Sequence, residues 1–423
     1  MKKILAMLLA LVMVLSLVAC GGNKPAENTT PKTDAPADST PVASTPDDTT
    51  PVDPAPVAGD YKIAMITDYG DITDQSFNQT TYEAVKAFAE ANGIAYNYYK
   101  PSGDSTAERV GMVDAAVADG YNVIVMPGFA FGGTIAEVSE IYPDVKFIAL
   151  DVAEGDLLEA GVTLAGEAYD YNPANWNLTD YVYMDNVYCA VYQEELSGYM
   201  AGVAAVKLGY KHLGYLGGMA VPAVQRFGYG FLQGVDAAAK ELGIVDQIKV
   251  EYIYGNQFFG DADITAVMDT WYGEKGVELV FACGGGIYTS AAEAAAKVGG
   301  KVIGVDSDQA PVIDGLYAEG MTVTSAMKGL APTVKDTLAD VILNGNWANY
   351  AGKIVSLGLI SADPEVNYVQ LPMESTQWSD TFTQDDYKAL VAAMFEGTVV
   401  VSNDIANFPV TEVAVEQYPD IKG

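Results

Sequence analysis

Short apolar segments and helical patterns alternate along most of this chain. From Tyr61 onward, each short apolar run is followed by a stretch whose apolar positions recur at helical spacing. The predicted strands are 63–66, 95–99, 123–126, 147–150, 213–216, 250–254, 279–282 and 302–305, and the predicted helices are 80–92, 105–119, 133–141, 194–208, 226–242, 264–273 and 289–298. Near-continuous apolar strands joined by helices predict parallel sheets that are buried on both faces.

The alternating pattern occurs in two blocks, which predicts two doubly wound α/β lobes. The first block ends near Leu150 and the second begins after Tyr188. The patterned region spans about 360 residues, which is too long for one compact core and suits two lobes. Between the blocks, residues 152–186 break the rhythm and predict an inserted loop, with or without a hairpin. We expect its aromatic residues to pack or to lie at the surface rather than to line a cleft; they are Tyr169, Tyr171, Trp176, Tyr181 and Tyr183.

The beginning of the chain has the features of a bacterial export signal. Lys2 and Lys3 precede the apolar run 4–18, which is too short for a membrane span and typical of a signal peptide. Leu-Val-Ala stands directly before Cys20 and two glycines follow it, which resembles the lipobox of bacterial lipoproteins. We therefore expect residues 1–19 to be a lipoprotein signal and Cys20 to carry a lipid anchor at the extracellular face of the cytoplasmic membrane. An ordinary cleaved signal with an incidental cysteine is the alternative.

Composition and charge restrict what the rest of the chain can bind. Residues 20–58 contain mainly Pro, Thr, Asp, Ala and Ser, so beyond the lipidated cysteine they predict a disordered tether. The whole chain has 56 acidic and 22 basic residues, a net charge of −34. This charge argues against nucleic acid or an anionic lipid surface as partner, because both bind cationic patches. Cys189 and Cys283 lie in apolar runs and predict two buried thiols, although a disulfide remains open.

Polar and aromatic side chains follow the predicted strands, where ligands of open α/β sheets bind. The residues expected to bind the ligand are Asp68, Asp74, Ser76, Phe77, Asn78, Phe129, Asp151, Phe258, Phe259, Asp306 and Lys328. Carboxylates and a lysine suit the vicinal hydroxyls of a ribose, and aromatic rings suit the flat face of a base. Two alternatives stay open: Asp74 and Ser76 also suit the cap of the following helix, and Phe77 also suits the core.

Motifs for catalysis are poorly represented in this sequence. The one histidine, His212, comes just before a predicted strand, where we expect it to be exposed or to cap. Ser325 and Lys328 match the Ser-x-x-Lys spacing of β-lactamases, but the partner motifs of those enzymes are missing. We therefore predict a binding protein without catalytic activity, cofactor or metal.

Five segments form an ordered set of motifs. They are 67–79 with its Asp-x-Ser-Phe-Asn-Gln core, 127–129 (Pro-Gly-Phe), 217–231 with Gly-Gly-x-x-x-Pro-x-Val-x-Arg-Phe, 303–309 (Ile-Gly-Val-Asp-x-Asp-Gln) and 324–328 (Thr-Ser-x-x-Lys). In this order, over about Tyr61 to Leu359, the chain resembles the basic membrane lipoprotein (PnrA-like) family of ABC transporter substrate-binding proteins.

The resemblance implies a type I periplasmic-binding fold, with two doubly wound lobes joined by a three-crossing hinge. On this basis the expected lobes are 59–188 with 309–347, and 189–308 with 348–423. The implied function is the capture of a purine nucleoside by a monomer that delivers it to an ABC permease, with a separate ATPase driving transport. The rivals are a binder of a sugar or other small polar solute on the same fold, and a surface sensor or adhesin.

The resemblance also implies roles for individual residues. Phe77 and either Phe258 or Phe259 would stack on the base, with Asn78 near its edge, while Asp151, Asp306 and Lys328 would bind the ribose. The sequence departs from the family pattern in two places. The insertion 152–186 follows directly on Asp151, and two adjacent phenylalanines leave the second stacking residue open.

Overall fold

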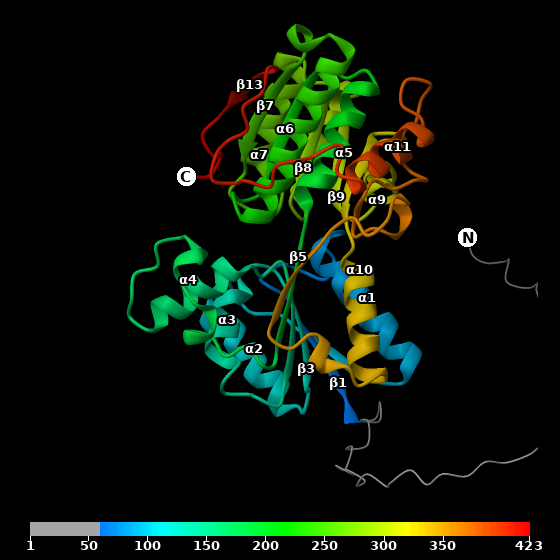
Figure 1. Cartoon of the computed structure of the whole chain (residues 1–423). Helices are drawn as coiled ribbons and strands as arrows, with labels where there is room; N and C mark the ends of the chain where they lie inside the picture. Colours follow the sequence, from blue (N-terminus) through cyan, green and yellow to red (C-terminus); the bar gives the residue numbers. More distant parts are fainter. Residues whose placement is uncertain (1–59) are drawn as a thin grey trace, which may run out of the picture. The chain divides into compact units, whose positions relative to one another are not determined.

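The structure is a computed structural model that describes residues 60–423. The predicted signal peptide (1–19), the predicted lipidation site Cys20 and the predicted tether (20–58) lie outside the described residues. Residues 60–423 form two α/β lobes, each built on one sheet (Figure 1). The predicted class of two doubly wound lobes is confirmed.

The first sheet is entirely parallel and has the strand order β11-β5-β4-β3-β1-β2. Its strands are β1 (Lys62–Ile66), β2 (Ala95–Tyr99), β3 (Val123–Pro127), β4 (Lys146–Leu150), β5 (Val187–Tyr192) and β11 (Lys353–Leu357), and its helices are α1 (Phe77–Asn92), α2 (Thr106–Ala118), α3 (Phe131–Val138), α4 (Glu154–Leu164) and α10 (Leu330–Leu338). Alternate strand residues point to opposite faces. Ile63 and Met65 pack with α1 and α10, whereas Ala64 and Ile66 pack with α2 and α3, so both faces are covered.

The second sheet has the order β12-β10-β9-β8-β6-β7-β13 and is parallel except for the antiparallel pair β10–β12. Its strands are β6 (His212–Gly217), β7 (Lys249–Tyr254), β8 (Leu279–Cys283), β9 (Lys301–Asp306), β10 (Thr322–Lys328), β12 (Val369–Gln370) and β13 (Ala414–Gln417), and its helices are α5 (Glu194–Lys207), α6 (Pro222–Leu242), α7 (Ala262–Asp269), α8 (Tyr288–Val298), α9 (Ala310–Leu316) and α11 (Gln384–Phe395). Leu213 and Tyr215 face α5, α6 and α11, whereas Leu216 and Val280 face α7 and α8.

Glycines allow α5 and α6 to approach each other closely. Each helix has two glycines that are four residues apart and so share one face of the helix. They are Gly198 and Gly202 on α5, and Gly230 and Gly234 on α6. A Cβ atom added at any of the four would collide with a backbone carbonyl of the other helix. The missing side chains therefore permit a backbone contact that fixes the start of α5 beside the first turns of α6, and both of these border the site described below.

Three segments carry the chain between the lobes, as predicted. They follow β5 (Tyr192 to Glu194), β10 (Lys328 to Leu330) and β11 (Leu357 to Val369).

The expected lobe boundaries, 59–188 with 309–347 and 189–308 with 348–423, need correction. All of β5 belongs to the first sheet, β10 belongs to the second, and β11 returns to the first. Each strand next to a crossing runs to the end of its sheet before the chain changes lobe. The boundaries therefore fall after these strands, whereas the expected ones fall before their ends.

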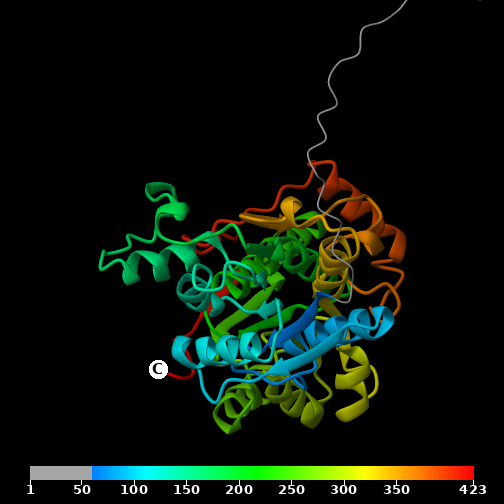
Figure 2. The same cartoon turned by 90° about the horizontal axis from the view of Figure 1, so that it is seen from below.

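The segment 152–186 is a helix followed by short turns, not the loop or hairpin predicted for it. After α4 come two 3-10 turns, Pro173–Asn175 and Leu178–Asp180. The segment projects from the side of the first lobe (Figure 2). Its aromatic rings pack on one another, with centroid distances of 5.3 Å for Tyr169–Tyr171, 5.8 Å for Tyr169–Trp176 and 5.6 Å for Trp176–Tyr181. Tyr183 is exposed, so the expectation that these aromatic residues pack or lie at the surface is confirmed.

Cys189 and Cys283 are both buried and unpaired within residues 60–423, as predicted. The expectation for His212 was wrong, because this residue begins β6 and its Nε2 lies 2.9 Å from Oε1 of Glu251. Glu251 is fully buried, and a buried carboxylate requires such partners.

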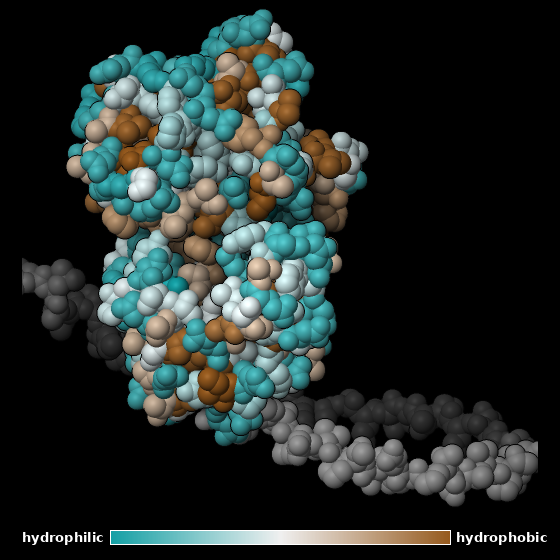
Figure 3. Space-filling model, turned by 90° about the vertical axis from the view of Figure 1, so that its left-hand side faces the viewer, coloured by the Kyte–Doolittle hydropathy of each residue, from teal (hydrophilic) through white to brown (hydrophobic). Residues whose placement is uncertain are grey.

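The surface seen in Figure 3 is mostly hydrophilic, with hydrophobic residues in small separate patches. Within residues 60–423, none of the helices combines the length and the apolarity needed to cross a bilayer.

Candidate ligand-binding site

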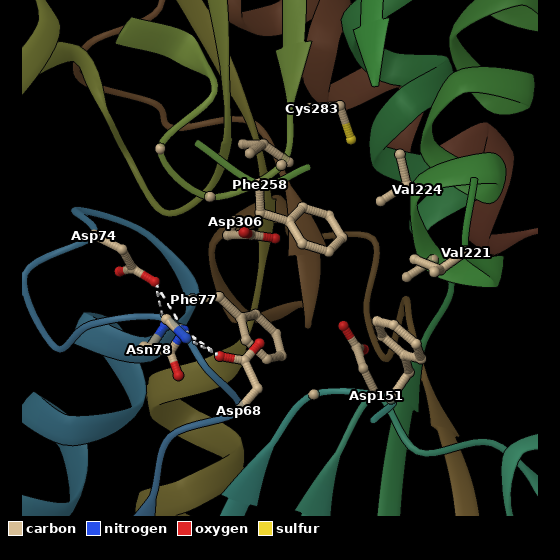
Figure 4. A pocket seen from close by; sticks show the side chains of 18 of the residues that line it. Asp68, Asp74, Phe77, Asn78, Asp151, Val221, Val224, Phe258, Cys283 and Asp306 are labelled. Atoms are coloured by element: carbon tan, nitrogen blue, oxygen red, sulfur yellow. Dashed lines mark hydrogen bonds between the residues drawn. The ribbon is translucent and has the colours of Figure 1, made fainter. Parts of the chain in front are cut away.

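A cavity lies at the carboxyl ends of the strands and is lined by residues of both lobes (Figure 4). Its volume of about 420 Å³ is within the range of small-molecule sites. The strand-end candidates that line it are Asp68, Asp74, Phe77, Asn78, Phe129, Asp151, Phe258, Phe259, Asp306 and Lys328. Ser76 is buried and does not line it. The cavity therefore lies where the sequence analysis expected a ligand site, beyond the carboxyl ends of the strands.

Asp151 and Asp306 occupy equivalent positions in the two lobes. Asp151 follows β4, and Asp306 ends β9. Their φ angles are 60° and 66°, in the left-handed region that non-glycine residues seldom adopt. Such strain costs on the order of 1–3 kcal/mol and is typical of functional sites. Figure 4 shows the two carboxylates entering the cavity from opposite lobes.

Lys328, at the end of β10, brings the two aspartates together. Its Nζ donates a hydrogen bond to Oδ2 of Asp151 and lies 3.6 Å from Oδ1 of Asp306. Oε1 of Glu194 lies 3.4 Å from the same nitrogen. Oδ1 of Asp151 is enclosed but has no hydrogen-bond partner among the described residues. A buried acceptor without a donor is costly, so this oxygen is free to accept a hydroxyl of a ligand.

The charges of this cluster shift one another's protonation. Burial raises the pKa of Asp151 to about 7, against the attraction of the Lys328 ammonium, and the nearby carboxylates act in the same direction as burial. Burial lowers the pKa of Lys328, but the three surrounding carboxylates outweigh it and hold that pKa above its usual value. The lysine therefore stays charged, while Asp151 titrates near neutral pH.

Glu194 and Arg226 belong to the same cluster, and the sequence reasoning missed both. Glu194 is fully buried, and its Oε2 accepts a hydrogen bond from Nε of Arg226 at 2.6 Å. Burial opposes ionisation of Glu194, but Arg226 and Lys328 hold its pKa below the usual value. Arg226 lines the cavity and stands within the motif 217–231, which was the available signal. Glu194 offered no signal beyond its place at the start of a helix.

Asp74 caps the helix that carries Phe77 and Asn78. Its Oδ1 accepts the backbone N–H groups of Ser76 and Gln79, and its Oδ2 accepts the backbone and side-chain N–H groups of Asn78, all at 2.9–3.0 Å. Four donors occupy this carboxylate, although burial raises its pKa. Of the two roles left open by the sequence, capping is the one the structure supports for Asp74.

Ser76 stands at the N-cap position of α1, but its side chain does not cap the helix. Its Oγ instead donates a hydrogen bond of 2.7 Å to Oδ2 of Asp306 in the other lobe. The Ser76 side chain therefore neither caps α1 nor lines the cavity.

Asp68 offers an acceptor beside Phe77. Its Oδ1 accepts the backbone N–H groups of Tyr69 and Gly70 at 2.6 Å each and the Asn78 amide at 3.3 Å, while Oδ2 has no partner among the described residues. Burial raises the pKa of Asp68 despite these donors. Because the Asn78 amide donates to Asp68 and to the capping carboxylate, its orientation is fixed. Asp68 Oδ2 is thus left to accept an N–H group of a ligand.

Two aromatic rings enter the cavity from opposite lobes. Phe77 begins α1, and Phe258 follows β7 (Figure 4). The Phe258 ring lies against Gly218 and Gly284, where an added Cβ would collide with it. Phe259 also borders the cavity but is 54% exposed. Phe258 is therefore the more enclosed of the two adjacent phenylalanines.

The start of α6 supplies an apolar wall that the sequence reasoning did not single out. It consists of Val221, Pro222, Ala223, Val224 and Phe227, all within the motif 217–231. The inserted segment contributes Ala153 and Asp156. Asp156 accepts the Ala153 N–H at 2.7 Å, and burial raises its pKa to about 6. Asp151 itself lines the cavity, although the insertion follows it directly in the sequence.

The arrangement can bind a ligand that combines an apolar, flat part with several hydroxyl or N–H donors. Its free acceptors are carboxylate oxygens, and its cations are already paired with carboxylates. Within residues 60–423, no group of three or more His, Cys, Asp and Glu side chains is placed to hold a metal ion.

Comparison with known families gives a match over most of the chain. Residues 61–387 match the family model described as ABC transporter substrate-binding protein PnrA-like. The chain is 26% identical over 334 residues to the ABC transporter nucleoside-binding protein BmpA of Lactococcus lactis, covering 73% of this chain and 85% of that protein. It is also 26% identical to basic membrane protein B of Borreliella afzelii, covering 70% of this chain and 78% of that protein.

Solved structures with the same architecture include solute-binding proteins. One from the ABC transporter system of Aeropyrum pernix has a TM-score of 0.57 at 22% identity, covering 82% of this chain and 88% of that one. One from Conexibacter woesei has a TM-score of 0.57 at 21% identity, covering 81% and 99%. This similarity confirms the type I periplasmic-binding fold.

Proposed function

Because the chain belongs to the PnrA-like family of ABC transporter substrate-binding proteins, we propose that it binds a purine nucleoside between its lobes and delivers it to a membrane permease. The family membership provides the general role, a small-molecule ligand and a permease as partner. The nucleoside is supported by one observation above all. Two aspartates from opposite lobes converge on Lys328, and Oδ1 of Asp151 lacks a donor that a ribose hydroxyl would supply.

The proposed pose follows from the positions of the remaining groups. The vicinal hydroxyls of the ribose donate to Asp151 and Asp306. The base lies between Phe77 and Phe258, which enter from opposite lobes, and base stacking on aromatic rings contributes about 1–3 kcal/mol. An N–H group of the base donates to Asp68. The name of the Lactococcus lactis relative, a nucleoside-binding protein, points the same way.

In the proposed function the protein binds its ligand and catalyses no reaction. Binding shifts the equilibrium between open and closed lobes by the ligand's higher affinity for the closed form. The protein acts as a monomer, and a separate ATPase subunit drives transport.

Isothermal titration calorimetry with inosine, guanosine, adenosine, cytidine, adenine and ribose tests the proposal. We expect saturable binding of purine nucleosides, weaker binding of the free base, and little binding of ribose. Binding of ribose without any nucleoside would contradict the proposal and favour a sugar binder. Release of free base from nucleoside, followed by chromatography, would instead reveal a hydrolase.

We also propose that the chain is held at the extracellular face of the cytoplasmic membrane through a lipid on Cys20. Metabolic labelling with a radioactive fatty acid should mark the wild-type chain and leave Cys20→Ser unlabelled. The serine variant should appear in the culture medium rather than in the membrane fraction. Equal labelling of both chains would rule out Cys20 as the lipidated residue.

A further inference from the structure

A short stretch of the first lobe, Gln75 and Ser76, makes direct hydrogen bonds to the second lobe. Ser76 Oγ donates to Oδ2 of Asp306 at 2.7 Å. The Gln75 carbonyl accepts Nε2 of Gln309 at 3.1 Å and Oγ of Ser307 at 3.4 Å. All three partners in the second lobe lie within four residues along the chain, at and just after the end of β9. These bonds therefore join the lobes beside one ligand-binding carboxylate.

The sequence around Ser76 leaves its hydroxyl free for this contact. An N-cap serine usually accepts backbone N–H groups of its own helix. Here the carboxylate of Asp74 takes the N–H groups of Ser76, Asn78 and Gln79. The serine hydroxyl is released from capping and points to Asp306, and the serine itself is fully buried.

The other two residues are also arranged for the contact between lobes. Gln75 has a φ of 57°, a strained left-handed conformation for a residue with a side chain. Gln309 is fully buried, and its Oε1 accepts the Val305 N–H at 2.9 Å. Its own backbone N–H donates to Ser325 Oγ at 3.1 Å. The amide orientation of Gln309 is therefore fixed, with Nε2 as a donor directed at the other lobe.

We propose that Gln75, Ser76 and Gln309 form an interlobe latch that positions Asp306, so that lobe closure and completion of the binding site occur as one event. The proposal rests on the proposed function, because Asp306 is the ligand-binding group that the latch positions. When the lobes separate, Asp306 loses the serine hydroxyl and Gln309 loses the Gln75 carbonyl. The latch thus stabilises the closed arrangement even without ligand, and Ser76 and Gln309 act through Asp306 as positioning residues.

Spin labels on the two lobes measure the latch directly. Lys86→Cys on α1 and Glu293→Cys on α8 are exposed attachment points, and the two native thiols of the folded region are buried. In a full-length Cys20→Ser background, pulsed electron spin resonance without ligand should show a closed population. Ser76→Ala and Gln309→Glu should reduce this population and weaken inosine binding by about tenfold, the size expected for a buried hydrogen bond to a charged partner or for a donor replaced by an acceptor.

Two further variants distinguish loss of the latch hydrogen bonds from general destabilisation of the fold. Ser76→Thr keeps the hydroxyl and should restore the closed population and the affinity. Ser139→Ala removes a fully buried serine hydroxyl that has no partner within the described residues, and it should match the wild type in both measurements. Thermal unfolding checks that each variant is folded, and Gln309→Glu provides a second test where Ser76→Ala fails to fold.

The outcomes distinguish the latch from the function on which it rests. Wild-type distances and affinities in both Ser76→Ala and Gln309→Glu would overturn the latch, as would a ligand-free wild type without any closed population. Absence of nucleoside binding in the wild type would overturn the proposed function, while the ligand-free distances of the variants would still decide the latch.

Discussion

Asp151 in the first lobe and Asp306 in the second are built alike but supported differently. Both follow buried parallel strands, both have positive φ, and both lie near Lys328. Oδ2 of Asp306 accepts a hydrogen bond from the Ser76 hydroxyl of the opposite lobe. Asp151 keeps an enclosed oxygen without a partner.

The two residues thus have the same backbone geometry but different hydrogen-bond partners. In the proposed pose a ligand hydroxyl supplies the donor that the first-lobe aspartate lacks, and burial makes its charge costly without that donor. In the proposed latch, the second-lobe aspartate also depends on the position of the other lobe, through its hydrogen bond from Ser76.

The largest effect should come from removing the cation that the two aspartates share. Lys328→Met leaves its three surrounding carboxylates without their common partner. Loss of one partner of a buried ion pair costs about 3–5 kcal/mol, so the free energy of unfolding should fall by that amount and nucleoside binding should disappear. Urea unfolding and calorimetry measure the two effects.

Lys100→Met is the matched control, because Lys100 also lines the cavity but forms an exposed pair with Asp71. Exposed pairs contribute about 0–1 kcal/mol, so this variant should stay near the wild type in stability. Equal destabilisation by both substitutions would contradict the buried cluster as the source of the effect.

The next largest effect should separate the ribose from the base. Asp151→Asn and Asp306→Asn keep the size of the side chain but weaken acceptance from hydroxyl groups. Each should weaken nucleoside binding by about 2 kcal/mol, in the range for hydrogen bonds to charged groups, and should leave binding of the free base unchanged. Calorimetry with inosine and hypoxanthine provides the test, and unchanged inosine affinity in either variant would refute the ribose role of that residue.

Stacking should contribute equally from the two lobes. Phe77→Ala and Phe258→Ala should each lower the affinity for a purine nucleoside by about 1–3 kcal/mol. Phe259→Ala, at the exposed neighbour of Phe258, should change it by less than about 0.5 kcal/mol. If Phe259→Ala has the larger effect, the assignment of the second-lobe ring is wrong.

The pH dependence should distinguish the two aspartates more finely. Asp151 has a pKa near 7 without ligand, and hydroxyl donors favour its ionised form. Ligand binding therefore releases a proton, and the affinity should rise between about pH 5.5 and 7.5, with about tenfold weaker binding at pH 6 than at pH 8. Calorimetry in buffers of different ionisation enthalpy measures the number of protons released on binding. Asp151→Asn should remove this dependence, and its persistence would assign the proton to another group.

The last prediction concerns the stability of the ligand-free chain, whose dependence on pH should be opposite in sign to that of the affinity. The raised pKa of Asp151 means that the folded chain binds more protons than the unfolded chain between about pH 4 and 7. Stability from this group should therefore fall as pH rises through that window and level off above it. The thermal midpoint should be a few degrees higher at pH 5 than at pH 8, and Asp151→Asn should reduce the difference.

The sequence predicted β1 to β4 and β6 to β9, most of which are continuous apolar runs, and their ends led to the cavity. It did not predict β5 or β10 to β13. It could not decide between the roles of Asp74 and Ser76, since both are good capping residues and only the loop geometry assigns the cap to Asp74. Glu194 was missed because its partners, Arg226 and Lys328, are distant in sequence. Pairwise contacts of this kind have no local signature.

The lobe boundaries were placed wrongly for a related reason. The sequence analysis did not predict β5, β10 and β11, which lie next to the crossings. A hydrophobic pattern also does not show to which sheet a strand near a crossing belongs. That membership depends on hydrogen bonds to strands elsewhere in the chain.

The order of strands in the two sheets also determines when the chain can finish folding. The outer strand β11 of the first sheet, and both outer strands of the second, β12 and β13, come from residues 353–417. During synthesis, a chain that emerges from its N-terminus first exposes unpaired strand edges until almost all of it is available. Such distant pairings form slowly. Neither sheet is therefore complete before the last part of the chain is available.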